Sequence, residues 1–207
     1  MEKTDLKRDW KRFYNPGRKD FEIVDVPEFT FLMVDGQGDP NTAQSYADAI
    51  QALYAVAYGL KFSCKTQLEK DFVVAPLEGL WWADSPDAFH RQLDKDSWKW
   101  TAMIHMPEWI TSELFAAAVE QAEAKKNLPA LPLMRLEVYC EGLAVQILHI
   151  GPYVEEGPTL LKLHEEFLPA NNLVEAGLHH EIYLSDPRRT APEKMKTVLR
   201  QPVRRID

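Results

Sequence analysis

The sequence feature that most constrains the fold is an internal repeat of a long apolar segment. Residues 21–36, "FEIVDVPEFTFLMVDG", match residues 136–151, "LEVYCEGLAVQILHIG", without a gap, and the offset is 151 − 36 = 115. Both segments are rich in β-branched and apolar residues, with a turn-forming residue near the middle, Pro27 or Gly142. This composition is typical of strands that bend. A chain that contains the same long strand twice is expected to fold as two related halves.

The segments that follow each copy also repeat in kind and order. Residues 39–60 and 152–172 carry apolar residues at helical spacing, and we expect these helices to end near Gly59 and Pro169. Two further apolar strand-like segments come next in each half, 72–86 with 98–107 and 177–187 with 195–203. Each half therefore reads strand, helix, strand, strand. The predicted fold class is α+β, with duplicated β-α-β-β units related by a pseudo-twofold axis.

The remaining segments complete the domain organisation. An alanine-rich stretch at about 108–127 predicts an extra helix that links the halves, which run from about 21 to 107 and from 128 to 207. Residues 1–20 are charged throughout and are expected to be a solvated leader outside the single domain 21–207. Ligand cavities often lie where duplicated halves meet.

Charge and cysteine content narrow the functional classes. The net charge of −8 argues against nucleic-acid binding, which favours a basic face. We expect no membrane span, because no run of about 18 apolar residues occurs. We expect no secretory signal, because the first residues lack an apolar core. Only Cys64 and Cys140 are present, so a reducing, cytoplasmic setting is the simplest expectation.

A carboxylate lies in the middle of an apolar strand segment in each half. Aligning the two segments makes Glu78 the counterpart of Glu181, with an offset of 181 − 78 = 103. Side chains alternate along a strand, so Glu78 is expected to face as Trp82 does, and Glu181 as Tyr183 does. Two acids related by the repeat predict a pair near the pseudo-twofold axis. A solvent-facing strand glutamate is the simpler alternative.

Aromatic residues flank these acids. We predict that a cavity is walled by four of them, Trp82, Trp98, Trp100 and Tyr183. Such walls would suit a flat aromatic or cationic molecule and would raise the pKa of a glutamate inside. For each tryptophan, ordinary core packing is the alternative.

Other kinds of chemistry have weaker support. His179 and Glu181 would share a strand face, but His105, His149 and His164 are scattered without ligand spacing, so no metal site is expected. The sequence contains no serine-nucleophile elbow and no phosphate-cradling or dinucleotide glycine motif. We therefore expect no cofactor.

Two segments carry a resemblance to a known family. Residues 145–167, "VQILHIGPYVEEGPTLLKLHEEF", and residues 177–189, "GLHHEIYLSDPRR", resemble the GyrI-like small-molecule-binding family. The resemblance covers nearly all of the chain after residue 20, and its most specific parts are "GPY" at 151–153 and "EIYL" at 181–184. It implies the fold of the effector-binding domain of bacterial multidrug-responsive regulators. Glu181 matches the buried glutamate with which those regulators meet cationic drugs.

Further motifs resemble a stand-alone branch of that family. The leader is too short for a DNA-binding domain. "GDPN", "PLEGLWW", "WKW" and "HHEIYLSDP" look like those of cyclopropanoid cyclopropyl hydrolases. This implies opening of the strained ring of DNA-alkylating natural products of the yatakemycin and duocarmycin type. In that chemistry Glu181 would act on water, and Glu78 or a tyrosine such as Tyr153 would donate a proton. The ligand-binding candidates are Trp82, Trp98, Trp100, Tyr183, Tyr139 and His149.

Two functions of different class remain open. The first is a detoxifying hydrolase, which two acids in one pocket would favour. The second is a protein that only binds cationic or aromatic drugs, or inhibits a partner such as DNA gyrase. Haem binding is a weaker third reading. An exposed sheet edge would permit a homodimer.

Overall fold

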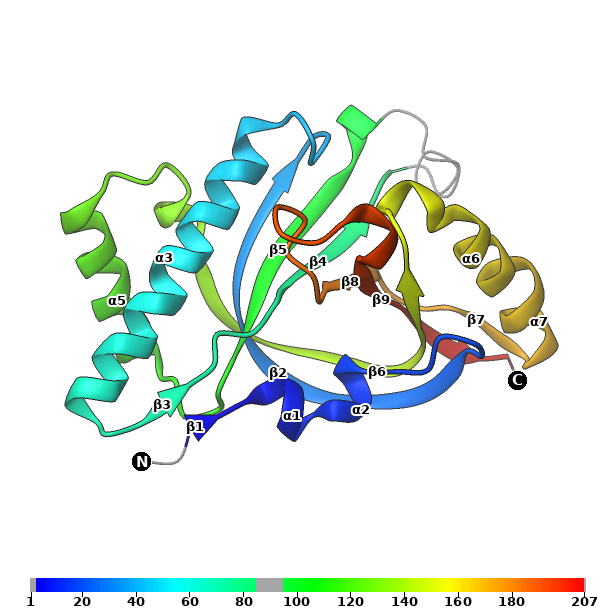
Figure 1. The fold of residues 1–207 in the computed structure, drawn as a ribbon, viewed down its shortest axis with the longest axis horizontal. Coiled ribbons are helices and arrows are strands. Elements are labelled where there is room, and N and C mark those ends of the chain that lie inside the picture. The colour runs from blue at the N-terminus through cyan, green and yellow to red at the C-terminus, as the bar shows by residue number, and fades with distance from the viewer. Residues whose placement is uncertain (1–2, 85–94, 207) are drawn as a thin grey trace.

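Six strands form a closed, barrel-like sheet in the computed structural model, which describes residues 3–84 and 95–206. Neighbouring strands are antiparallel, and the sheet closes because the last strand pairs back to the first (Figure 1). In sheet order the strands are β6 (Arg135–Ile150), β2 (Glu22–Gln37), β5 (Lys99–Met106), β4 (Leu77–Trp82), β8 (His179–Tyr183) and β9 (Lys196–Arg205). Closure pairs both sides of these strands, so the open edge expected to permit a homodimer is absent from their paired stretches.

Helices cover the outer face of this sheet. The first half carries α3 (Gln44–Gln67), against which the linking helix α5 (Ser112–Lys125) packs. The second half carries α6 (Gly157–Lys162), which continues through a π-helical turn, Leu163–Phe167, into α7 (Leu168–Ala170). The two helical groups lie on opposite flanks of the strands (Figure 1). The smaller elements are β1 (Lys3–Thr4), α1 (Leu6–Asp9), α2 (Lys11–Tyr14), β3 (Asp71–Phe72), β7 (Leu173–Glu175), and 3-10 turns at Lys95–Ser97, Leu131–Leu133, Tyr153–Glu155 and Pro192–Lys194.

The predicted fold class is confirmed, although the assigned strand bounds differ slightly from the repeat. Both halves run strand, helix, strand, strand, and α5 lies between them. The long strands β2 and β6 have 16 residues each and start 135 − 22 = 113 positions apart. Each leads to a glycine with positive φ, Gly38 or Gly151, and these are also 151 − 38 = 113 apart. The bends themselves keep the expected offset of 115, because the interior side changes from Val26 to Phe29 in β2 and from Glu141 to Ala144 in β6. Helix α3 also runs past Gly59, which packs close to Ala118 of α5.

The bends in β2 and β6 change which side chains face the barrel interior. Val24 and Val26 belong to the interior core before Pro27, whereas Phe29 and Phe31 belong to it afterwards. The pairing of β2 with β6 skips Pro27, which has no N–H to donate. On β6, Gly142 adopts a φ of 69°, a conformation that glycine tolerates best. The alternation of inward and outward residues therefore reverses at each bend.

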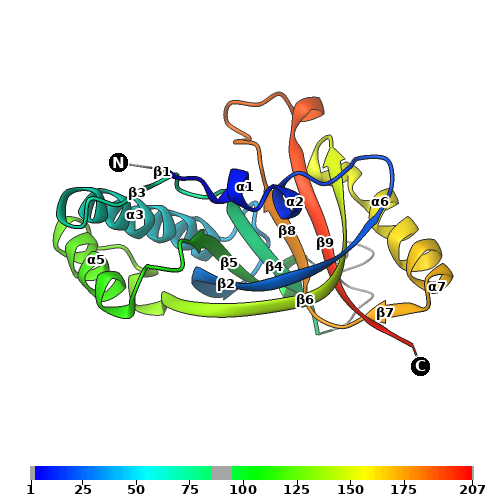
Figure 2. The same cartoon turned by 90° about the horizontal axis from the view of Figure 1, so that it is seen from below.

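The N-terminal segment is part of the folded core and is not only a solvated leader. Helices α1 and α2 lie across one side of the barrel (Figures 1 and 2). Leu6, Phe13 and Tyr14 are buried, and the last two pack with the residues inside the barrel. These apolar residues lie among lysines and arginines in the sequence, which masked them as core residues. Among the described helices, none is long and apolar enough to cross a membrane.

Candidate functional site

Glu78 and Glu181 lie on opposite faces of the sheet, so the predicted carboxylate pair is wrong. Strands β4 and β8 pair Glu78 with Ile182, and Gly79 with Glu181. Residues directly opposite in an antiparallel pair share a face. Glu78 and Ile182 therefore face the barrel interior, and Glu181 faces outward with Gly79. A one-residue error in aligning two strands reverses the face of every side chain.

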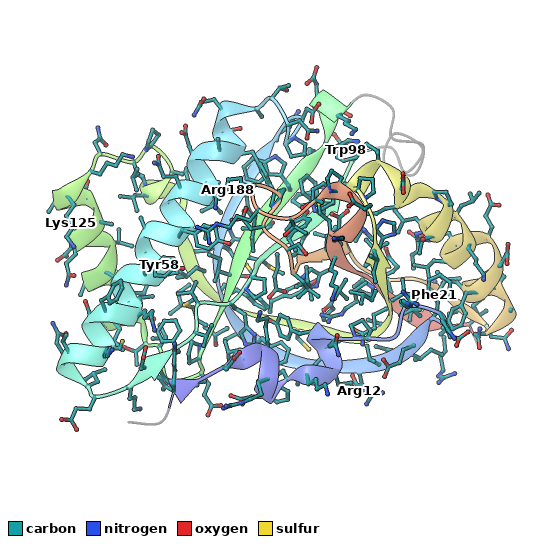
Figure 3. The ribbon with its side chains drawn as sticks, in the orientation of Figure 1. Arg12, Phe21, Tyr58, Trp98, Lys125 and Arg188 are labelled. Atoms are coloured by element: carbon teal, nitrogen blue, oxygen red, sulfur yellow. The ribbon has the colours of Figure 1, made fainter. Side chains whose placement is uncertain are left out.

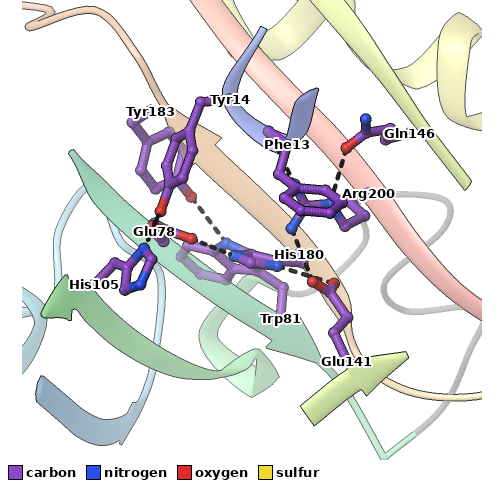
Figure 4. Close-up of polar contacts among 10 residues, drawn as sticks. All are labelled: Phe13, Tyr14, Glu78, Trp81, His105, Glu141, Gln146, His180, Tyr183 and Arg200. Carbon is purple, nitrogen blue, oxygen red and sulfur yellow. Dashed lines mark hydrogen bonds and ion pairs between the residues drawn. The ribbon is translucent and has the colours of Figure 1, made fainter. Parts of the chain in front are cut away.

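Inside the barrel, Glu78 belongs to a chain of buried polar contacts (Figure 4). The Tyr14 hydroxyl donates to Glu78 Oε1 at 2.7 Å, and His180 Nε2 donates to Glu78 Oε2 at 2.9 Å. His180 Nδ1 lies 3.0 Å from Glu141 Oε1, and Arg200 Nη1 donates to Glu141 Oε2 at 2.8 Å. Since one carboxyl group accepts from each ring nitrogen, the contacts suit a doubly protonated His180.

The pKa values of this interior network agree with paired charges. Burial alone would lower the pKa of His180, but Glu141 and Glu78 outweigh it and raise the pKa to about 9. Burial would likewise raise the pKa of Glu141, but His180 and Arg200 lower it to about 2. Burial lowers the pKa of His105 to about 4, against the effect of Glu78. His105 is then neutral, and its Nδ1 can donate to the Tyr14 oxygen at 2.8 Å.

This interior region has little room for a ligand. The cavity beside the network has a volume of about 10 Å³ and is lined by Phe13, Tyr14, Glu78, Tyr139, Glu141 and Arg200, among others. That is about the space that one water molecule needs. Glu78 and Tyr139, two of the predicted site residues, therefore belong to the packed interior of the barrel and not to a ligand pocket.

Aromatic residues gather on the opposite, outer face of the sheet. Trp81 lies edge-on to Trp98 at a centroid distance of 6.0 Å, and Tyr46 of α3 lies 4.9 Å from Trp100. We call the following set the aromatic cluster: Tyr46, Trp81, Trp98, Trp100, Tyr153 and Tyr183. Trp82 was predicted to lie in this cluster, but Trp81 lies there. Side chains alternate along β4, so Trp82 points to the other face of the sheet. Trp100 is only 1% exposed and packs as a core residue.

A hydrogen bond joins the two strands across this cluster. Trp81 Nε1 donates to the Tyr183 hydroxyl at 2.8 Å (Figure 4). Both groups fold over Gly79, where an added Cβ would lie 2.7 Å from Trp81 Nε1 and 3.2 Å from the Tyr183 hydroxyl. The absent side chain at Gly79 is therefore what lets the two rings meet beside Glu181.

Glu181 lies at the solvent-accessible side of the aromatic cluster. Its side chain is 15% exposed, and one oxygen is 3.4 Å from His179 Nε2. Burial, and then the negative charge of Glu181, raise the pKa of the Tyr183 hydroxyl well above its usual value. Tyr153 is half-buried and lies edge-on to Tyr183 at 5.6 Å. Among the predicted acid–base residues, the fold thus brings Glu181 and Tyr153 together.

A second carboxyl group, Glu156, approaches the same place and was missed in the sequence. Glu156 directly precedes α6 and is 4% exposed. Burial, and then the charge of Glu181, raise its pKa to about 9. In the sequence it is one of two adjacent glutamates before "GP", a pattern equally typical of an exposed helix start. No local signal distinguishes it from Glu155, which is exposed.

His149 lies at the edge of this region. Strand pairing sets His149 opposite Thr197, and Thr197 opposite Tyr183, so the three residues form one row across β6, β9 and β8. His149 is half-buried, with its Nε2 close to Gly151. Of the predicted ligand contacts, His149, Trp98, Trp100 and Tyr183 therefore share the outer face. Within residues 3–84 and 95–206, no three His, Cys, Asp or Glu side chains are grouped as metal ligands.

A larger groove lies elsewhere, between α3 and α5. Its volume is about 380 Å³, and its lining includes Tyr54, Tyr58, Gln121, Lys125 and Lys126 but no carboxylate. Figure 3 shows Tyr58 on α3 and Lys125 at the end of α5. The groove offers apolar and basic contacts, whereas the acid–base groups lie beside the aromatic cluster.

A duplicated, closed sheet with acids and aromatic rings on its outer face is compatible with a small-molecule-binding domain. The chain belongs to the GyrI-like family: the family model for the GyrI-like small molecule binding domain matches residues 19–204. A search of curated proteins found no match.

Solved structures extend this finding. An uncharacterized conserved protein from Listeria innocua is 43% identical, with a TM-score of 0.90, over 98% of this chain and 100% of that one. A protein from the same organism described as a hydrolase is 42% identical, with a TM-score of 0.85 and the same coverage. The C-terminal domain of EcmrR is 11% identical with a TM-score of 0.56, covering 90% of this chain and 98% of that one, so it shares the fold.

Proposed function

We propose that this protein is a hydrolase that adds water to the cyclopropane ring of flat, DNA-alkylating cyclopropanoid compounds and so protects against them. The observation that carries the proposal is the setting of Glu181, a carboxylate 15% exposed and directly opposite Gly79. Trp81 and Tyr183 meet over that glycine, and Tyr153 lies edge-on to Tyr183. Aromatic rings can stack on a flat substrate, and the carboxylate can take a proton from water. The hydrolase description of a 42% identical relative supports the reaction class.

The reaction can be written so that its atoms and electrons balance. The water oxygen bonds to the less hindered cyclopropane carbon while Glu181 accepts a water proton. The strained carbon–carbon bond breaks, and its electron pair passes through the conjugated ring to the carbonyl oxygen. That oxygen takes up one proton and becomes a phenol. Substrate plus water therefore gives a single product.

Tyr153 is suited to hold the carbonyl oxygen during this step. Burial, Glu156 and Glu181 raise the pKa of its hydroxyl to about 12, so the phenol stays neutral and can donate a hydrogen bond. Glu78 has no part in the proposal, because it faces the barrel interior and accepts from Tyr14 and His180.

The direct test is incubation with a cyclopropane-containing alkylator, followed by mass spectrometry for the water adduct. We expect Glu181→Gln to fold and to bind the compound, while turnover falls by about 10²–10⁴-fold, the usual contribution of a general base. The amide keeps the size and the hydrogen bonding of the side chain but cannot accept the proton.

Glu28→Gln is the matched control, because Glu28 is also a strand glutamate but is exposed. Its turnover should equal that of the wild type. Unchanged turnover in Glu181→Gln would remove Glu181 from the mechanism.

A binding-only function is the second candidate. The observation in its favour is that Glu156 and Glu181 approach each other beside the aromatic cluster, which also suits an aromatic cation. Titration calorimetry with a monovalent aromatic cation would then show binding that Glu181→Gln weakens, while the cyclopropane compound stays intact.

A further inference from the structure

We propose that Glu156 is a second catalytic carboxyl group, which donates the proton that the substrate oxygen takes up when the ring opens. This role rests on the hydrolase function proposed above. Its basis is the position, beside the proposed base, of a buried acid with one oxygen that has no hydrogen-bond partner among the described residues.

The first step is the hydrogen bonding of Glu156. Its side chain is almost fully buried, and Oε1 has no hydrogen-bond partner among the described residues. About nine in ten buried polar groups are hydrogen-bonded, because leaving one without a partner is unfavourable. A buried acid with a free oxygen is therefore suited to a partner that arrives with the ligand.

The second step is where the side chain lies. Glu156 comes from the turn before α6, and its carboxyl group lies beside Thr197 of β9. Thr197 is directly opposite Tyr183 in the pairing of β8 with β9. Glu156 also interacts electrostatically with Glu181 and with Tyr153. The acid and the base thus converge from different elements on one end of the aromatic cluster.

The third step concerns which group can give up the proton. A pKa of about 9 leaves Glu156 protonated at neutral pH. The product is a phenol, whose ordinary pKa is about 10. Transfer from Glu156 is therefore slightly downhill, whereas transfer from Tyr153, with a pKa of about 12, is uphill. Tyr153 orients the oxygen, and Glu156 supplies the proton.

The cycle closes without another reactant. After ring opening, Glu181 holds the proton from water and Glu156 is ionised. The excess proton then passes from Glu181 to Glu156, directly or through a water molecule, and both groups return to their starting states. One water molecule is consumed for each ring opened.

The first test compares Glu156→Gln with Glu155→Gln, a matched control whose side chain is exposed. At pH 7, turnover of the cyclopropane alkylator should fall by about 10²–10⁴-fold in Glu156→Gln and stay unchanged in Glu155→Gln. In the wild type, kcat/KM should decrease above about pH 9, where Glu156 loses its proton, and Glu156→Gln should lack this alkaline limb. An active Glu156→Gln with the wild-type alkaline limb would overturn the assignment.

The second test needs no turnover. Unfolded glutamate loses its proton near 4.5, whereas folded Glu156 keeps it to about pH 9, so the wild type loses stability as pH rises through this interval. Glu156→Gln lacks this loss, so its Tm should exceed that of the wild type by an amount that grows from pH 5 to pH 9. A constant difference would overturn the protonated state of Glu156. A wild type that leaves the alkylator intact would instead refute the hydrolase function, and the catalytic role with it.

Discussion

At the scale of single residues, Gly79 determines the geometry of the aromatic cluster. It faces outward, directly opposite Glu181 of β8 on one side and Ala102 of β5 on the other. The indole of Trp81 and the hydroxyl of Tyr183 occupy the space that a side chain would need. The hydrogen bond between them therefore depends on this glycine, and so does the approach of both rings to Glu181.

We predict that Gly79→Ala destabilises the protein by about 1–3 kcal/mol, because the new methyl group must displace the Trp81 ring. Urea unfolding followed by tryptophan fluorescence measures the loss, and affinity for a flat aromatic compound should fall with it. Gly17→Ala is the control, since no atom lies within 4 Å of a Cβ there. Equal midpoints for the two variants would show that Trp81 moves freely.

At the scale of elements, side-chain hydrogen bonds connect the N-terminal segment to the strands of the barrel. Helix α2 ends at Tyr14, which hydrogen-bonds Glu78 of β4 and approaches His105 of β5. Arg200 of β9 donates to the Phe13 carbonyl at 2.6 Å. These contacts connect a short segment, which has little helical stability of its own, to three strands.

We predict that Tyr14→Phe costs about 1–3 kcal/mol of unfolding free energy, because the ring still packs while buried groups on Glu78 and His105 lose a partner. Tyr58→Phe is the comparison, since Tyr58 is 47% exposed and its hydroxyl can bond to water. Chemical denaturation of both variants gives the difference. A Tyr14→Phe variant as stable as Tyr58→Phe would mean that the interior contacts contribute nothing net.

Sequence patterns predicted the elements because their signals are local. Alternation and helical spacing identified β2, α3, α5 and β8 from neighbouring residues. Contacts between distant elements could not be predicted in this way, because no pattern among neighbouring residues records them. The face of Glu78 depends on a strand register that an alignment can miss by one residue. The burial of Glu156 depends on β9, which lies about 40 residues further along the chain.

At the scale of the whole molecule, the closed sheet separates two polar regions that titrate differently. The interior network contains His180 and Glu141, with pKa values of about 9 and about 2. The outer region contains Glu156, which is held neutral. Both regions contribute to how stability changes with pH.

We predict that stability is greatest between about pH 4.5 and 6.5. The raised pKa of His180 gives stability that is complete below 6.5 and is lost as pH rises to about 9. Glu156 costs stability increasingly from about pH 4.5 to 9, but up to 6.5 this loss is offset by His105, whose lowered pKa adds stability as pH rises from about 4 to 6.5. The lowered pKa of Glu141 gives stability that is complete above 4.5 and is lost as pH falls to about 2. Thermal unfolding from pH 3 to 10 tests the profile. A Tm that rises from pH 7 to pH 9 would contradict it.

The hydrogen bond from Arg200 to the Phe13 carbonyl joins residues that are 187 positions apart. A ribosome adds about 5–20 residues per second, so Phe13 emerges roughly 10–40 s before its partner is made. Throughout that time the barrel against which the apolar side chains of α1 and α2 pack is incomplete. The contact can therefore form only after Arg200 has been made, so the N-terminal aromatic residues stay uncovered until nearly all of the barrel strands have been synthesised.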